Sequence, residues 1–457
     1  MRSVSTTVAR LCLALLVTGT TLLSAVAQEN SPFARYGLGN IYSGSNVVSR
    51  SMGGLGVAYA DGLNNNVGQS VNFSNPATYG NLYMTSFDLG LMIDSRTLRS
   101  NNPSGHFQSN YFIPTYVVVG MPLNRKKGWG LAFGLRPVTR INYSVHTFEQ
   151  IRTDSLVNVY EGSGGLNQFF VGLGKKWKSL NIGFNAGYHF GNKDISTKKA
   201  FVNDTVFHYQ SNSFTNTHFN GLFFDAGMQY EIKLSKKEFK EKKSTDQYAL
   251  RFGATASLKQ QLSASQDIGR QTYTQTSNGE VTIDSIYEVK NIKGKITLPF
   301  SYAGGITFHK TTTGVRGAFE MWSIGAEYAV TQWTQYRFYG QTEPLVNSWQ
   351  MKVGGQFCPN PINGKNYWSN VNYRAGVYYG KDYVNPDGNG LKQFGVSLGA
   401  GLPVKKWRSY DYQFTTINTA FEFGKRGSSV NNITENYFQL SFGLSLSDIW
   451  FQKRKYD

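Results

Sequence analysis

Apolar and polar residues alternate over the last predicted strand of the chain, residues 437–449. One face carries only apolar side chains and the other carries Gln, Ser and Gly; the apolar set is Phe438, Leu440, Phe442, Leu444 and Leu446. Such a strand fits a water-soluble sandwich or a membrane barrel, since both have one wet and one apolar face. Its place at the end of the chain, its closure by Trp450 and Phe451, and many similar segments upstream favour an outer-membrane barrel.

The same alternation recurs from Thr85 onward in fourteen segments, each near the roughly 10 residues that a tilted membrane strand needs. The segments are Phe87–Ile93, Tyr111–Leu123, Trp129–Tyr143, Asn167–Gly174, Leu180–Phe190, His218–Ile232, Tyr248–Leu262, Lys295–Phe308, Ala318–Thr331, Ser348–Phe357, Val371–Tyr379, Gln393–Val404, Phe414–Phe423 and Tyr437–Ile449. Short connections alternate with longer ones, as periplasmic turns and external loops do in such barrels. The sequence therefore predicts an all-β fold: a 14-stranded antiparallel transmembrane outer-membrane β-barrel over residues 85–457.

The first residues have the pattern of a secretory signal peptide. Arg2 and Arg10 precede and flank an apolar stretch, Leu11–Leu23, and Ala25-Val26-Ala27 is a small-residue cleavage site. We expect residues 1–27 to be removed and the chain to reach the outer membrane of a Gram-negative cell. Only Cys358 then remains, so no internal disulfide is expected.

Composition changes this picture little. The formal net charge is +18, but the basic residues cluster in predicted short turns, so solvated turns or contacts with anionic head groups explain them better than nucleic acid does. The expected surroundings are outer-membrane lipid and lipopolysaccharide. Residues 28–84 are rich in Gly and Asn and show little alternation, which separates them from the barrel as a plug or hatch.

Eight charged residues fall on the predicted inward face: Asp88, Arg136, Asp225, Arg251, Glu327, Lys352, Arg374 and Glu422. In a wide porin such charges line a water channel; in a plugged barrel they pair with one another and with the plug, since an unpaired buried charge is costly. The balance of signs and several inward glycines favour the plugged barrel.

No constellation for catalysis stands out, and we expect neither an enzyme nor a cofactor. The six His residues lie mostly in predicted loops or rims, without Cys or carboxylate at metal-ligand spacing. The glycines at 53, 54 and 56 are not followed by the Lys-Ser/Thr of a phosphate-binding loop.

The N-terminal region carries a family resemblance. Its glycine-rich stretch (Gly53, Gly54, Gly56), the pair Ala60-Asp61 and the motif Asn75-Pro76-Ala77 resemble the FadL-like long-chain fatty-acid transporter family. The start, residues 31–39, is similar to outer-membrane proteins of this group from Bacteroidota, which include PorV-like barrels. The resemblance implies fourteen strands around an N-terminal plug.

The resemblance also implies a route for hydrophobic ligands, which pass the plug and leave sideways through a defect in the wall. Pro137 removes a hydrogen-bond donor inside a predicted strand, and Gly134 lies just before it. These residues are the candidate wall kink, with Pro114 and Pro299 as weaker candidates; a bulge near the rim is the alternative interpretation.

Three sequences of the pattern Asp-Ser/Thr-aliphatic lie in predicted outer loops and suggest O-glycans on Ser155, Thr205 and Ser285. The leading functional hypothesis is a FadL-type barrel that binds or passes hydrophobic small molecules. The alternative is a non-transporting barrel that acts as a protein-binding subunit of an outer-membrane assembly or secretion complex.

Overall fold

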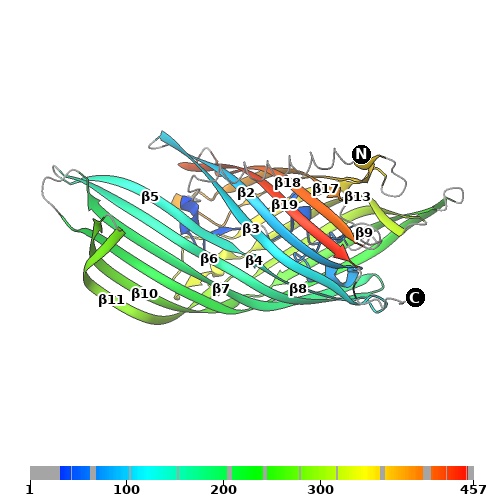
Figure 1. The fold of residues 1–457 in the computed structure, drawn as a ribbon, viewed down its shortest axis with the longest axis horizontal. Coiled ribbons are helices and arrows are strands. Elements are labelled where there is room, and N and C mark those ends of the chain that lie inside the picture. Colours follow the sequence, from blue (N-terminus) through cyan, green and yellow to red (C-terminus); the bar gives the residue numbers. More distant parts are fainter. Residues whose placement is uncertain are drawn as a thin grey trace, which may run out of the picture.

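The chain forms one closed antiparallel β-sheet in the computed structural model (Figure 1). The structure describes residues 31–42, 44–61, 68–101, 104–151, 154–202, 208–239, 244–276, 279–314, 317–360, 366–404, 413–428, 430–448 and 450. The predicted signal peptide, residues 1–27, lies outside the described residues.

Nineteen strands make up the sheet. They are β1 (Asn40–Ile41), β2 (Thr85–Asn101), β3 (Ser104–Asn124), β4 (Trp129–Pro137), β5 (Thr139–Ile151), β6 (Asp154–Trp177), β7 (Leu180–Phe201), β8 (Gln210–Phe239), β9 (Ser244–Ser257), β10 (Gln260–Thr276), β11 (Gly279–Leu298), β12 (Ser301–Gly314), β13 (Gly317–Thr331), β14 (Arg337–Phe338), β15 (Ser348–Phe357), β16 (Asn372–Lys381), β17 (Lys392–Pro403), β18 (Phe414–Arg426) and β19 (Ile433–Asp448). β1 and β14 are two-residue additions, and the pairs β4/β5, β9/β10 and β11/β12 each form one interrupted wall strand. The wall therefore has fourteen strands, as predicted, and the pairing of β19 with β2 closes it.

Short helices occur only outside the wall strands in the part of the chain that the structure describes. In the N-terminal segment they are η2 (Pro32–Arg35), α2 (Val47–Arg50) and η4 (Pro76–Asn81); in later connections they are η5 (Trp333–Gln335), η6 (Tyr367–Asn370) and η7 (Pro386–Gly388). No helix among the described residues is long and apolar enough to cross a membrane.

The wall has the inverse polarity of a soluble protein. On β19, Phe442 and Leu446 are each 40% exposed, whereas Ser441 and Ser445 are buried. Alternate side chains of a strand point to opposite faces, so the apolar face of this strand is outside and its small polar face is inside. This is the arrangement of a barrel whose outer surface meets hydrocarbon.

The two ends of the barrel differ. The loop end carries the β2–β3, β5–β6, β7–β8 and β10–β11 connections, and the turn end carries β3–β4, β6–β7, β8–β9 and β12–β13. Strand length varies around the wall, from 10 residues in β15 and β16 to 24 in β6 and 30 in β8. The part of the wall made by β5, β6, β7, β8, β10 and β11 therefore forms a long extension at the loop end, on the left of Figure 1.

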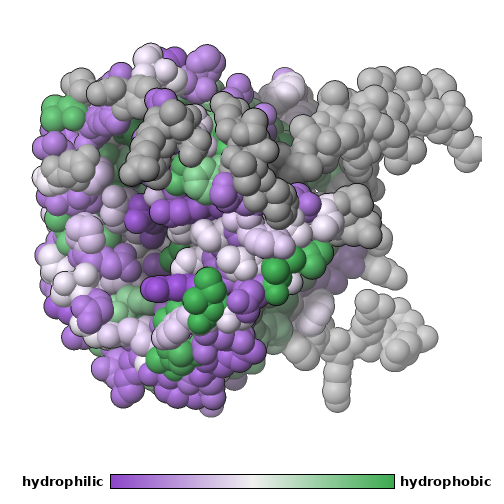
Figure 2. Space-filling model, turned by 90° about the vertical axis from the view of Figure 1, so that its left-hand side faces the viewer, coloured by the Kyte–Doolittle hydropathy of each residue, from purple (hydrophilic) through white to green (hydrophobic). Residues whose placement is uncertain are grey.

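Several predicted connections are in fact strands. Residues 192–217, 235–246 and 263–293 lie between segments that the sequence predicts as strands. The structure assigns the first and third of these ranges largely to β7, β8, β10 and β11, and most of the second to β8 and β9. Both faces of β11 are exposed along most of its length, so no apolar face marks it as a strand in the sequence. At the loop end the surface is mostly hydrophilic with separate hydrophobic patches (Figure 2).

Candidate functional site

The N-terminal segment, residues 31–84, lies against inward-facing groups of many wall strands. Asn46 caps α2 by accepting a hydrogen bond from Ser49 N at 2.9 Å, and the turn after the helix uses Gly53 at φ +72° and Gly54 at φ +85°. A Cβ on Gly53 would lie 2.9 Å from backbone atoms of Val377, so glycine lets the segment touch the wall.

The Asn75-Pro76-Ala77 motif starts η4 and is fully enclosed. The Asn75 side chain accepts a hydrogen bond from Ala77 N at 3.0 Å and donates one to Val57 O at 2.7 Å. A Cβ on Gly183 of β7 would lie 2.2 Å from the Pro76 carbonyl, so the wall glycine makes room for the motif. The structure thus places the glycine-rich stretch and the Asn75-Pro76-Ala77 motif in one packed unit inside the wall.

Three predicted lumen charges bind the backbone of this segment. Glu327 accepts hydrogen bonds from Gly56 N and Val57 N, both at 2.9 Å, and Asp88 accepts one from Val71 N at 3.1 Å. Lys352 donates to Gly54 O at 3.2 Å and pairs with Glu327 at 2.8 Å. These groups hold the segment through charge-assisted hydrogen bonds.

The other five predicted lumen charges have different partners. Arg136 lies 5.4 Å from the ring centre of Phe73 and interacts electrostatically with Asp225. Arg251 pairs with Glu231 at 2.6 Å, Arg374 donates to Gln356 and Asn418, and Glu422 accepts from Tyr378. The structure describes all eight predicted lumen charges, and Lys352–Glu327 is the one ion pair that it shows between two of them.

A second charged network, absent from the sequence-based set, lies nearer the loop end. Arg96 pairs with Asp94 at 3.1 Å and with Glu435 at 3.3 Å, and Arg426 pairs with Asp382 and Glu435. It borders a cavity of about 300 Å³ that is also lined by Arg50, Lys352, Glu422 and Tyr378. Asp94 and Arg96 continue the spacing of two residues that starts at Asp88, so extending the predicted first strand would have found them.

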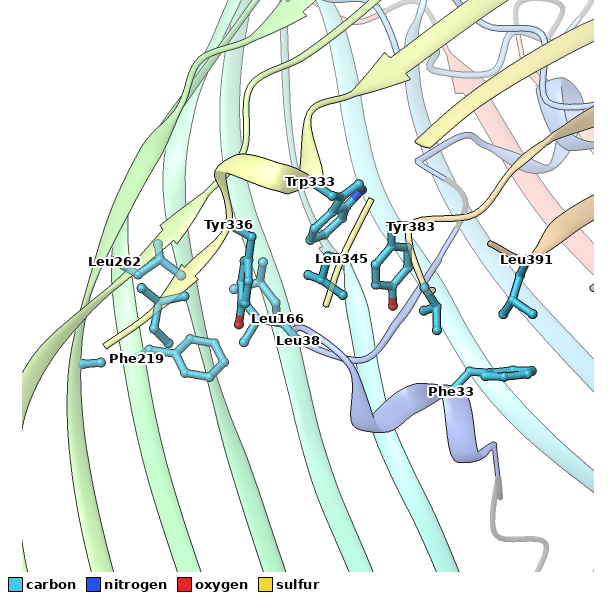
Figure 3. Close-up of a cluster of buried hydrophobic side chains, with 13 residues drawn as sticks. Phe33, Leu38, Leu166, Phe219, Leu262, Trp333, Tyr336, Leu345, Tyr383 and Leu391 are labelled. Atoms are coloured by element: carbon cyan, nitrogen blue, oxygen red, sulfur yellow. The ribbon is translucent and has the colours of Figure 1, made fainter. Parts of the chain in front are cut away.

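The barrel is filled near the loop end by a cluster of apolar side chains, which we call the mouth cluster. Trp333, Tyr336, Leu345, Tyr383 and Leu391, all from connections, face residues of the N-terminal segment and the wall (Figure 3). The remaining members are Phe33, Leu38, Leu166, Phe219, Leu262, Ala264, Ile296 and Val384. Through this cluster the connections, the N-terminal segment and the inner face of the wall pack into one hydrophobic core.

The wall is interrupted beside the candidate kink. The β3–β4 ladder ends at the pair Val117↔Leu135, and beyond Pro137 the strand continues as β5, which pairs with β6 and not with β3. β1 pairs instead with the start of β5, and Tyr42 N donates to Val138 O at 2.9 Å. A pocket of about 350 Å³ lies at this gap, lined by residues that include Tyr42, Ile113, Pro114, Leu135 and Arg140.

The remaining predicted positions are placed as follows. Ser155 lies at the start of β6 and Ser285 on β11, both at the loop end; Thr205 lies outside the described residues. Cys358 is buried just after β15, and burial raises the pKa of its thiol to about 11. No group of His, Cys, Asp and Glu that could hold a metal ion occurs among the residues that the structure describes.

Together, the closed fourteen-stranded wall, the enclosed N-terminal segment and the interrupted strand define a barrel with the FadL-type fold. Among solved structures, the chain is similar to the Pseudomonas putida toluene transporter TodX, with 14% identity, coverage of 90% of this chain and 100% of that one, and a TM-score of 0.53. It is also similar to a Pseudomonas aeruginosa FadL homologue, with 12% identity, coverage of 90% and 100%, and a TM-score of 0.51. At these identities the likeness shows the fold alone.

A comparison of the sequence with protein-family models shows the family to which the chain belongs. The BamG family model matches residues 8–457, nearly the whole chain, so the protein belongs to the BamG family. A search of the curated proteins finds no match to this chain.

Proposed function

We propose that this BamG family member is a non-transporting barrel of the outer membrane, exported by a cleaved signal peptide, that serves as a protein-binding subunit of an assembly or secretion complex. The observation that carries the proposal is that two packed elements occupy much of the lumen. The mouth cluster occupies the loop end, and the N-terminal segment below it acts as a plug bound to Asp88, Glu327 and Lys352. Membership of the BamG family also supports a role with protein partners.

The energetics of the plug support a static role. Glu327 and Lys352 form a buried pair, with side chains 4% and 16% exposed. Withdrawal of the plug would take two backbone N–H donors from Glu327 and one from Asp88. Each buried group left without its partner costs about 1–3 kcal/mol, so moving the plug at every transport event is expensive.

The shape of the wall supports partner binding. A bilayer needs about 10 residues of each tilted strand, whereas β6, β7 and β8 have 24, 22 and 30. The excess projects from the membrane as ordered sheet. The projecting ends of β6, β7 and β8 offer an ordered surface for protein contacts. The outward apolar face of the wall meets lipid and lipopolysaccharide.

A second candidate function, the binding or passage of hydrophobic small molecules, is favoured by one observation. The pocket at the wall gap lies beside residues 113–116 of β3, which have no partner on the β4 side, and beside the β1–β5 contact. Its apolar lining includes Ile113, Val117 and Leu135, although Arg136 and Arg140 also border it. A ligand leaving sideways here would avoid the aqueous route.

Gentle extraction of the native protein, followed by mass spectrometry for proteins and lipids, separates the two functions. The proposal expects stoichiometric protein partners; a partner-free monomer that carries a hydrophobic ligand would support the second function instead. A disulfide between Ile41→Cys and Thr139→Cys, which are paired residues of β1 and β5, adds a functional test. Locking this contact should leave a protein-binding subunit active, and it should stop lateral passage through a channel.

A further inference from the structure

The turn end carries a projection of the wall, which we call the tongue. It consists of the ends of β8 and β9, Ile232–Phe239 and Ser244–Gln247, continued by β12 and β13. The neighbouring β6–β7 turn stops at the level of Glu231, whose N–H donates to Ser179 O at 2.9 Å. β8 therefore extends eight residues past its neighbour, about 26 Å at ~3.3 Å per residue.

One edge of the tongue is open. β7 pairs with β8 only as far as Leu180↔Tyr230, and among the described residues no strand pairs with that edge from Ile232 to Phe239. A β-bulge at Leu234 marks the root of the tongue. Leu234 and Phe239 are 56% and 43% exposed. An open edge presents a row of backbone donors and acceptors to which another strand can be added.

The surface beside this edge is basic. Seven exposed lysines follow one another from the β3–β4 turn through the β6–β7 turn to the edge: Lys126, Lys127, Lys176, Lys178, Lys233, Lys236 and Lys237. The turns are joined by backbone contacts, since Lys176 N donates to Gly128 O at 2.8 Å. The nearby carboxylates already have cationic partners: Glu231 with Arg251, Asp246 with Lys310 and Glu238 with Lys236. Lys236 is the partner of Glu238, and the other six lysines leave the basic strip with a surplus of positive charge.

We propose that the tongue binds an acidic, extended segment of a periplasmic protein, which adds as a strand to the β8 edge. This inference rests on the proposed function, because it names the class of one partner. A second copy of the chain fits poorly, since its edge lysines would face these lysines. Lipid head groups can neutralise lysines, but they cannot satisfy a row of strand donors and acceptors in register.

The test uses the full chain in nanodiscs of phosphatidylcholine and a fluorescent peptide of five Glu-Thr repeats. We expect the wild type to bind this peptide, and the double variant Lys236→Glu/Lys237→Glu to bind about tenfold more weakly. The matched control Lys290→Glu/Lys293→Glu makes the same change on exposed residues of β11 at the other end, and it should bind like the wild type. A peptide with the same side chains but N-methylated at alternate residues should lose binding, because it cannot complete the ladder.

Four results would overturn the proposal. Equal binding by the two double variants would remove the tongue from the site, and undiminished binding of the N-methylated peptide would show diffuse charge attraction. A second set of nanodiscs contains added phosphatidylglycerol. If the wild type retains this lipid, loses the retention in Lys236→Glu/Lys237→Glu and does not bind the peptide, the strip is a lipid site. If the native wild type has partners and Lys236→Glu/Lys237→Glu retains all of them, the tongue assignment fails while the proposed function stands; if the wild type has none, the proposed function itself fails.

Discussion

Replacing Glu327 by Ala tests whether the N-terminal segment is locked to the wall. The carboxylate accepts from Gly56 N and Val57 N and pairs with Lys352, so the substitution leaves two N–H groups and an ammonium group without their acceptor. Breaking a buried pair by removing one partner costs about 3–5 kcal/mol. Taking ~3 kcal/mol as the part lost from docking of the segment, its opening should become about 100-fold more frequent.

Amide hydrogen exchange of the folded protein in detergent measures this opening. Protection of the segment around Gly56 and Val57 should fall about 100-fold, while the wall strands keep theirs. The double variant Glu327→Gln/Lys352→Met removes the uncompensated charge and should recover part of the protection. Glu231→Ala serves as the control, because it breaks an ion pair with Arg251. The structure shows no hydrogen bond from Glu231 to the described residues of the N-terminal segment. Unchanged protection at Gly56 and Val57 in Glu327→Ala would refute the argument that this carboxylate locks the plug.

Three further predictions concern the wall, the thiol and the loop end. In Gly376→Ala the new Cβ would lie 2.2 Å from the Met52 carbonyl carbon, so exchange in the N-terminal segment should rise while the barrel still resists SDS at room temperature; unaltered exchange would contradict the close contact. Cys358, with its pKa raised to about 11 by burial, should react with iodoacetamide roughly 300-fold more slowly at pH 7.5 than a thiol of pKa about 8.5, and its rate should climb as pH rises toward 11; a rate equal to that of a free thiol would show that the site is open. If Ser155, Thr205 and Ser285 carry O-glycans, the intact mass of the native protein should exceed the mass of the polypeptide. The excess should fall in the triple variant that replaces these residues by Ala, and an unshifted native mass would end the glycan hypothesis.

The fourteen-stranded wall was predictable because its outer face is apolar and its inner face polar, which imposes alternation along each strand. β19 shows this directly, with Phe442 outside and Ser441 inside. Where a strand extends past the rest of the wall, that constraint ends. Both faces of β11 are exposed along residues 280–291, and their Glu, Thr, Ser and Lys residues have the composition of a loop. The strand ends were therefore underestimated at the loop end and at the tongue.

The contents of the barrel were less predictable, because they depend on contacts between distant segments. The inward charges follow from alternation, but their partners do not. Glu327 accepts a hydrogen bond from Gly56 N, 271 positions away, and Arg426 forms ion pairs with Asp382 and Glu435. The mouth cluster is a stronger case. Trp333 and Tyr383 stack at 4.5 Å although each belongs to a different connection, and no periodicity in either connection marks them as core.

The wall gap shows how register gives meaning to residues that are uninformative singly. The β3–β4 ladder ends at Val117↔Leu135, and the same register carried further would set Thr115 opposite Pro137 and Pro114 opposite Val138. Neither proline has an N–H, so two adjacent positions of the ladder lack a donor, and pairing stops there. The carbonyl of Val138 then accepts from Tyr42, and β1 takes the place of β3 beside β5. The N-terminal segment and the wall gap are thus joined through the β1–β5 contact, on which the two candidate functions make opposite demands. A protein-binding subunit keeps this contact, whereas a lateral channel must break it whenever a ligand passes.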